Sequence, residues 1–344
     1  MNHEFGIGAG DSGLIPIVTI TLNPAIDEAV SIDHFVLGST NRCRLDSLDP
    51  GGKGVNVSRL IRRLGRATIA LGFVGGVTGA LLRARLDVEG VPNDFDDVPD
   101  LTRLNVMVYE SALGRRTRAY LPGARVDPSK LDALRTRLAA IPPASTVVIG
   151  GSIPPGLAPT VYRDLVGELK DRGIAVIVDS SGPSLAAAIG AGPTLIKPNV
   201  EEAAEILGRP LVDDRDVTQA ALDLMRRGAK NVVVSQGEEG AIGVGPEGCW
   251  KAVPPKIAAI STVGSGDSMV AGLAIAIADG RGLAEGLRLG TAAGAATAMT
   301  PGTQLGQADD VAALLPQVAV NAIPPPCMTA GLSTVAGETL GLPS

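Results

Sequence analysis

Histidine and cysteine are scarce in this chain of 344 residues, and their scarcity narrows the possible chemistry. The two histidines, His3 and His34, argue against histidine-ligated zinc and against Ser-His-Asp or Cys-His catalysis. The three cysteines are far apart in the sequence and show no metal-ligand spacing. A sparse, odd number of cysteines fits a reducing compartment, so we expect a cytoplasmic protein. Any general base must then be a carboxylate, a lysine or a tyrosine.

Aromatic residues, basic patches and long apolar runs are also missing. Aromatics make up 2% of the chain and Trp250 is the one tryptophan, so no stacking platform for nucleic acid is expected. The formal charge is −6, and no basic stripe interrupts the sequence. No apolar run is long enough for a membrane span, and the first residues do not resemble a signal peptide. Small molecules are therefore the expected partners, with neither nucleic acid nor membrane involved.

Short β-branched runs alternate with helical stretches through the middle of the chain. Residues 15–22 predict a first strand, and residues 54–64 predict a helix with apolar residues at i, i+3, i+4 and i+7. Such alternation is typical of parallel strands joined by helical crossovers. Further elements are predicted as strands at 146–149, 175–179, 194–196 and 231–235, and as helices at 160–172, 183–190, 201–207 and 217–227.

Two segments interrupt this alternation and set the expected domain organisation. Residues 28–47 and 102–121 have the mixed polarity of extended strands outside the main sheet. They predict a small sheet that closes over the site as a lid, or an edge that pairs with another subunit. We expect one α/β domain over residues 15–320, with flexible tails at 1–14 and 321–344.

The segment 261–272 carries the strongest chemical signal. A β-branched run ends at Gly264-Ser265-Gly266, and Asp267 follows at the start of an apolar helix predicted to end near Ala278. Glycines bring backbone amides close to a ligand, and a helix N-terminus attracts anions. A carboxylate in such an anion site suits phosphoryl transfer, in which it accepts a proton while negative charge builds nearby. The structural alternative is that Asp267 is only a helix cap or first-turn acid.

A second glycine-rich loop covers residues 50–56. Gly51, Gly52 and Gly54 free backbone amides, Lys53 adds a positive charge, and Asn56 lies in the first helical turn. The spacing is not that of a Walker loop. The alternative is a strand-to-helix turn with a solvated lysine.

Together these stretches resemble the ribokinase-like (PfkB) family of ATP-dependent sugar kinases. The resemblance covers about residues 15–318 and includes both glycine-rich stretches, 51–56 and 264–267, as well as 151–156, 179–182, 197–202 and 235–240. It implies a three-layer α/β/α sandwich with a mostly parallel central sheet and a small β-sheet lid. The opening Thr21-Leu-Asn-Pro-Ala-Ile-Asp27 resembles the branch that acts on phosphorylated hexoses.

The resemblance also implies roles for individual residues. Asp267 would be the catalytic base, and the amides of Gly264, Ser265 and Gly266 would form an anion hole. ATP would bind at Lys197, Asn199, Ser235, Gly237, Gly240 and Thr262. The sugar phosphate would bind at Asp27, Gly51, Gly52, Lys53, Asn56, Arg103 and Ser152. Asn199 and Glu202 would hold Mg²⁺ through water or phosphate, and the carbonyls of Ser261 and Val263 with the loop 300–302 would form a potassium site.

The substrate within the branch remains open between three ketohexose phosphates. The stretches 121–124, 179–182 and 300–305 resemble 6-phosphofructokinases, which favours fructose 6-phosphate. Lys53, Ser265 and the stretch 40–42 look more like 1-phosphofructokinases and tagatose-6-phosphate kinases. A sensor that keeps the fold without catalysis is the alternative from another class, and intact glycines around Asp267 argue against it. The extended segments predict a homodimer.

Overall fold

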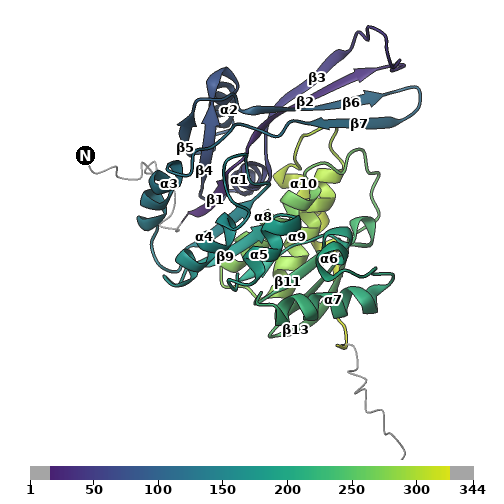
Figure 1. Cartoon of the computed structure of the whole chain (residues 1–344). Coiled ribbons are helices and arrows are strands. Elements are labelled where there is room, and N and C mark those ends of the chain that lie inside the picture. Colours follow the sequence, from purple (N-terminus) through teal and green to yellow (C-terminus); the bar gives the residue numbers. More distant parts are fainter. Residues whose placement is uncertain (1–15, 326–344) are drawn as a thin grey trace, which may run out of the picture.

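A large sheet forms the middle layer of the computed structural model, which describes residues 16–325 (Figure 1). Among these residues the sheet has ten strands, and those from β11 to β5 are parallel to one another. In spatial order they are β14 (Ala319–Ala322), β13 (Gly248–Val253), β12 (Ala241–Gly245), β11 (Val232–Ser235), β10 (Leu195–Ile196), β9 (Ala175–Asp179), β8 (Thr146–Gly150), β1 (Ile17–Thr21), β4 (Thr68–Gly75) and β5 (Asn93–Val98).

Helices cover both faces of this sheet and complete three layers. Val57, Leu60 and Ile61, three of the four residues in the predicted apolar face of the first helix, are fully buried, whereas the fourth, Leu64, is half-buried at the C-cap. Truncating a buried leucine to alanine costs about 2–5 kcal/mol. One face carries α1 (Lys53–Arg63), α8 (Ser265–Ala278), α9 (Leu283–Ala298) and α10 (Ala308–Leu314). The other carries α3 (Lys130–Ala139), α4 (Val161–Lys170), α5 (Gly182–Ile189), α6 (Val200–Leu207) and α7 (Asp214–Arg226). The predicted three-layer α/β/α fold is confirmed.

A smaller sheet of four strands projects from one end of the body (Figure 1). Its order is β3 (Arg44–Gly51), β2 (Ala25–Ile32), β6 (Arg103–Glu110) and β7 (Arg115–Tyr120). Strands β6 and β7 lie within the predicted segment 102–121, whereas β2 and β3 extend beyond the predicted segment 28–47 at its two ends. Helix α2 (Gly76–Val88) packs between β4, β5 and the base of this sheet.

The C-terminal boundary differs from the sequence prediction. Strand β14 pairs antiparallel with β13 and crosses position 320, where we expected the kinase domain to end. The four-residue run at 319–322 is too short to show a period that would mark it as a strand, and it pairs with β13 at the sheet edge. The predicted N-terminal tail and most of the C-terminal one lie outside the described residues. Within residues 16–325, no helix has the length and apolar character that crossing a membrane requires.

Candidate active site

A cleft of about 1610 Å³ opens at the carboxyl ends of the parallel strands, between the body and the small sheet. Parallel strands place such ends along one edge of a sheet, so segments that are distant in sequence meet there. Of the residues that the sequence predicts for the site, Gly51 and Ser261 do not line the cleft. Those that do are Asp27, Gly52, Lys53, Asn56, Arg103, Ser152, Lys197, Asn199, Glu202, Ser235, Gly237, Gly240, Thr262, Val263, Gly264, Ser265, Gly266 and Asp267.

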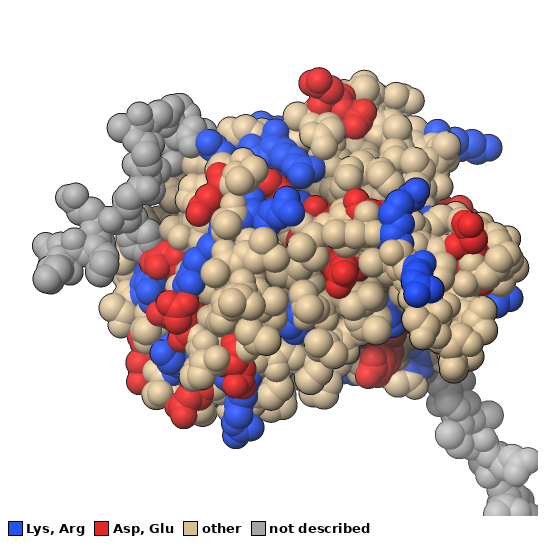
Figure 2. All heavy atoms as spheres, turned by 90° about the horizontal axis from the view of Figure 1, so that it is seen from above, with Lys and Arg blue, Asp and Glu red and all other residues tan. Residues whose placement is uncertain are grey.

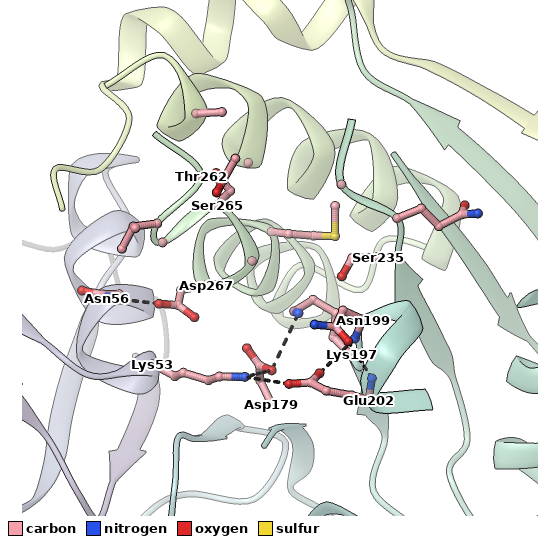
Figure 3. A pocket seen from close by; sticks show the side chains of 18 of the residues that line it. Lys53, Asn56, Asp179, Lys197, Asn199, Glu202, Ser235, Thr262, Ser265 and Asp267 are labelled. Carbon is pink, nitrogen blue, oxygen red and sulfur yellow. Dashed lines mark hydrogen bonds and ion pairs between the residues drawn. The ribbon is translucent and has the colours of Figure 1, made fainter. Parts of the chain in front are cut away.

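Asp267 lies in the first turn of α8 and faces Asn56 on α1 (Figure 3). The Nδ2 of Asn56 donates a hydrogen bond to Oδ2 of Asp267 over 2.8 Å. Burial and the charge of Asp179 raise the pKa of Asp267 to about 6, against the opposing effects of Lys53 and the Asn56 hydrogen bond. A carboxylate with this pKa is mostly ionised at neutral pH and is still a stronger proton acceptor than an ordinary aspartate.

Lys53 connects the acidic groups on the floor of the cleft (Figure 3). Its Nζ lies 2.8 Å from Oδ1 of Asp179 and 3.9 Å from Oε1 of Glu202. Burial lowers the pKa of Lys53, but the charges of Asp179, Asp267 and Glu202 outweigh it and raise the pKa above its usual value. Lys197 approaches the same oxygen of Asp179 to 3.7 Å. The alternative of a solvated loop lysine therefore does not describe Lys53.

The backbone before Asp267 has the geometry of an anion site. Gly264 has φ 79°, a left-handed conformation that a residue with a Cβ rarely adopts, and it caps α8 without a side-chain hydrogen bond. The first amides of a helix have no partner within the helix, so they point outward to the cleft. The Ser265 amide makes a long contact of 3.3 Å to the Thr262 carbonyl, while Oγ of Ser265 is buried without a partner.

Asn199 and Glu202 form a complete capping box at the start of α6. The Glu202 amide donates to Oδ1 of Asn199 over 2.7 Å, and Oε2 of Glu202 accepts from the Asn199 amide over 2.9 Å. The pair therefore has a structural role at the start of this helix. Both residues also line the cleft, and Oε1 of Glu202 faces Lys53. Among residues 16–325, no cluster of three or more His, Cys, Asp or Glu residues could enclose a metal.

The end of the cleft near the small sheet is polar and tightly packed. Oδ1 of Asp27 accepts a hydrogen bond from Asn105 over 2.7 Å, and burial raises the pKa of Asp27. Gly51 lies behind it, where an added Cβ would come within 2.1 Å of Oδ2 of Asp27. Arg103 donates to the carbonyls of Asn23 and Leu121, while its buried Nε has no partner.

Polar contacts attach the small sheet to the loops around the anion site. Nη2 of Arg116 on β7 donates to the Ile260 carbonyl over 2.5 Å, and Oγ1 of Thr303 donates to Oδ2 of Asp49 over 2.5 Å. Ser261, two residues before Val263, donates from Oγ to the Gly302 carbonyl over 2.7 Å. The segments 261–263 and 300–302, which the sequence pairs as a potassium site, are therefore adjacent in space.

Similarity to known proteins is a further line of evidence on the family of this chain. The model of the pfkB family of carbohydrate kinases matches residues 20–310. The chain belongs to this family. Its curated relatives include ATP-dependent 6-phosphofructokinase isozyme 2 of Escherichia coli K12, 38% identical over 86% of this chain and 97% of that protein. They also include 1-phosphofructokinase of Borreliella burgdorferi, 33% identical over 89% of this chain and 99% of that protein.

The fold of this pfkB-family chain also matches solved structures. Phosphofructokinase-2 from E. coli in complex with potassium superposes with a TM-score of 0.85 at 37% identity, covering 88% of this chain and 99% of that one. The resemblance stated from the sequence, the fold and the kinase family are therefore confirmed. The similar proteins include both 6-phosphofructokinases and 1-phosphofructokinases. The similarity therefore does not distinguish between the substrates of these two enzymes.

Sequence reasoning missed some residues of this pfkB-family site. Asp179 is the last residue of the predicted strand 175–179, but its contact with Lys53 forms only because the fold brings together residues 126 positions apart. Arg118 and Tyr120 also line the cleft, from the strand β7, whose side chains are exposed along its whole length. Their alternation on a mixed-polarity strand was visible in the sequence, but nothing in it showed which face points toward the cleft.

Proposed function

We propose that this chain transfers the γ-phosphoryl group of ATP to fructose 6-phosphate, giving fructose 1,6-bisphosphate and ADP. The observation that carries this proposal is Asp267, held by Asn56 at the N-terminus of α8 inside a cleft wide enough for both substrates. A base beside the N-terminal amides of a helix suits attack of a hydroxyl on a phosphoryl group. No histidine lines this cleft, and Asp267 is the carboxylate in the first turn of α8.

In this mechanism Asp267 accepts the proton of the sugar hydroxyl as that oxygen bonds to the γ-phosphorus. The bond from the γ-phosphorus to the bridging oxygen breaks, and ADP leaves with its electron pair. Proton acceptance of this kind contributes roughly 10²–10⁴-fold to the rate. The amides of Gly264, Ser265 and Gly266 bind the charge on the transferring group, and one such donor is worth about 2.7–4 kcal/mol in other enzymes.

The nucleotide end of the cleft is built from backbone turns that follow strands. Gly240 has φ 91°, and an added Cβ would come within 2.0 Å of the Ala252 carbonyl, so glycine is required there. Ser235 and Gly237 line the same end, where Asn199 forms a single bridge with Ser235. We assign ATP to this end, with Lys197 and Thr262 between its phosphates and Asp267.

The acidic floor fits Mg²⁺ that is bound mainly through water and phosphate. Mg²⁺ keeps several waters and uses one or two carboxylates, and Oδ2 of Asp179 is buried without a hydrogen-bond partner. Asn199 and Glu202 would hold the ion, which when bound neutralises charge on the ATP phosphates. Carbonyls near Ser261 and Val263, beside the loop 300–302, offer the oxygen ligands that K⁺ takes.

Arg103 supplies the charge for the sugar phosphate at the other end. Its Nε is buried and unpaired at the cleft, and a guanidinium binds phosphate oxygens well. Asp27, Gly52, Lys53, Asn56 and Ser152 complete the sugar site in this proposal, and Gly51 leaves room for the Asp27 side chain behind it. The second candidate is 1-phosphofructokinase, favoured by Lys53, Ser265 and the relative from B. burgdorferi; tagatose-6-phosphate kinase is the third.

We propose that the chain forms a homodimer in the cytoplasm. Strand β7 at the edge of the small sheet is exposed along its whole length, and an unpaired edge of this kind invites pairing with a second copy. Figure 2, which views the molecule of Figure 1 from above, shows acidic and basic side chains interspersed over this face. It shows no large patch of one charge sign that would suit nucleic acid.

Phosphorus NMR of the reaction mixture tests the activity directly. With Mg-ATP and fructose 6-phosphate, we expect ADP and a second sugar-phosphate resonance to grow in equal amounts. The same products from fructose 1-phosphate alone would favour the second candidate. ATP binding without turnover on any ketohexose phosphate would favour the sensor hypothesis.

A further inference from the structure

Arg59 is the largest fully buried side chain of the described residues, although it carries a charge. A buried guanidinium is costly unless its donors are satisfied. Its Nε and Nη2 donate to the Glu89 carboxylate over 2.9 and 2.7 Å, at the C-terminal cap of α2. Its Nη1 donates to the Pro50 carbonyl over 2.8 Å. This arginine therefore connects α2, the end of β3 and its own helix α1.

The same nitrogen also contacts the residue that holds the proposed base. Nη1 of Arg59 donates to Oδ1 of Asn56 over 3.3 Å, and Nδ2 of Asn56 donates to Asp267 over 2.8 Å. The two residues are three positions apart on α1, which places them on one face of the helix. A flipped amide would direct Asn56 NH₂ toward the guanidinium and its oxygen toward the carboxylate of Asp267. Both contacts would then be repulsive, so Arg59 sets the orientation of the amide.

We propose that Arg59, anchored by Glu89, is a positioning residue that fixes Asn56 as the hydrogen-bond donor to the base Asp267. The inference rests on the proposed kinase function. Arg59 touches neither substrate in this arrangement, because it lies outside the cleft and acts through Asn56. The alternative is that Arg59 only joins α1 to α2 and the small sheet.

These two roles differ in their effect on pH dependence. The groups whose charge or hydrogen bond acts on Asp267 are Asp179 from β9, Lys53 and Asn56 from α1, and Lys197 after β10. The Asn56 hydrogen bond lowers the pKa of Asp267, so its loss raises that pKa. A merely structural role would change stability and leave the acidic limb of the rate profile in place.

Arg59→Lys tests the proposal, because lysine keeps the charge but cannot reach Glu89, Pro50 and Asn56 together. Arg63→Lys is the matched control: Arg63 lies one turn further along α1, shares Glu89 and does not contact Asn56. For Arg59→Lys, we expect kcat to fall by about 10- to 100-fold, as small misplacements of reacting groups do. KM for ATP should stay within about twofold, and the acidic limb of kcat should move to higher pH.

A double-mutant cycle tests whether Arg59 affects kcat through Asn56. In the Asn56→Ala background, Arg59→Lys should lower kcat by less than about twofold further, because residues acting through one contact are not additive. An equal loss in both backgrounds, or the same loss from Arg63→Lys, overturns the proposal. If Arg59→Lys does not fold, Glu89→Gln takes its place in the cycle with the same criterion. A wild-type protein that phosphorylates no ketohexose phosphate would instead refute the proposed function.

Discussion

Replacing Asp267 by asparagine removes proton acceptance while leaving the shape of the site in place. The amide carbonyl of the substituted side chain can still accept the hydrogen bond that Asn56 donates to Asp267 over 2.8 Å. A positioned base contributes about 10²–10⁴-fold, which is about 2.7–5.4 kcal/mol of barrier at 1.36 kcal/mol per decade. We therefore expect kcat to fall by that factor while the affinity for ATP changes by less than about threefold.

Stability separates this chemical loss from misfolding. The folded-state pKa of Asp267 is about 6, above its ordinary value of 3.8, because burial disfavours the ionised form. The carboxyl group therefore contributes most to stability below pH 3.8, and that contribution is lost as the pH rises through about 6. At pH 7–8 a neutral amide avoids the free-energy cost of ionising a buried carboxyl group. The variant should melt at the same temperature as the wild type or higher.

Coupled ADP release and thermal melts measure both quantities on the same preparations. The control is Asp309→Asn, an exposed acid in the first turn of α10, which should leave kcat unchanged. An Asp267→Asn variant with more than about a tenth of wild-type kcat would refute the assignment of this residue as base. A lower melting temperature together with weaker ATP binding would point to lost structure.

Three further outcomes follow from the geometry of the cleft. Below about pH 6, where Asp267 becomes protonated, wild-type kcat should fall about tenfold per pH unit, and a flat profile down to pH 5 would contradict that role. Arg103→Ala should raise KM for the sugar phosphate far more than KM for ATP, and equal effects would remove it from the phosphate site. Gly51→Ala should displace Asp27 and raise the sugar KM, whereas Gly167→Ala, in open space on a helix, should leave kinetics unchanged and add about 0.5–1 kcal/mol of stability.

The main layers of the fold could be predicted from the sequence because their signals are local. The buried strand β9 and the amphipathic helix α1 appear within two residues of the predicted bounds, since apolar periodicity fixes them. The edge strand β14 could not be predicted in this way. Its four residues are mostly exposed, and the strand is placed by its pairing with β13.

The candidate site shows the same division between local and tertiary signals. Gly264 and Asp267 could be predicted because a glycine-rich turn and the start of an apolar helix are adjacent in the sequence. The contact of Asp179 with Lys53, and the series Glu89, Arg59 and Asn56, depend on packing between separate elements. No spacing in the sequence marks such contacts, because the arginine and its carboxylate lie on different helices.

The most direct test of the account is ADP release with Mg-ATP against a panel of acceptors. The panel contains fructose 6-phosphate, fructose 1-phosphate, tagatose 6-phosphate, and unphosphorylated fructose and ribose. We predict the highest kcat/KM for fructose 6-phosphate and little turnover of the unphosphorylated sugars. Turnover of fructose or ribose alone would show that Arg103 does not bind a substrate phosphate and would contradict the proposed function.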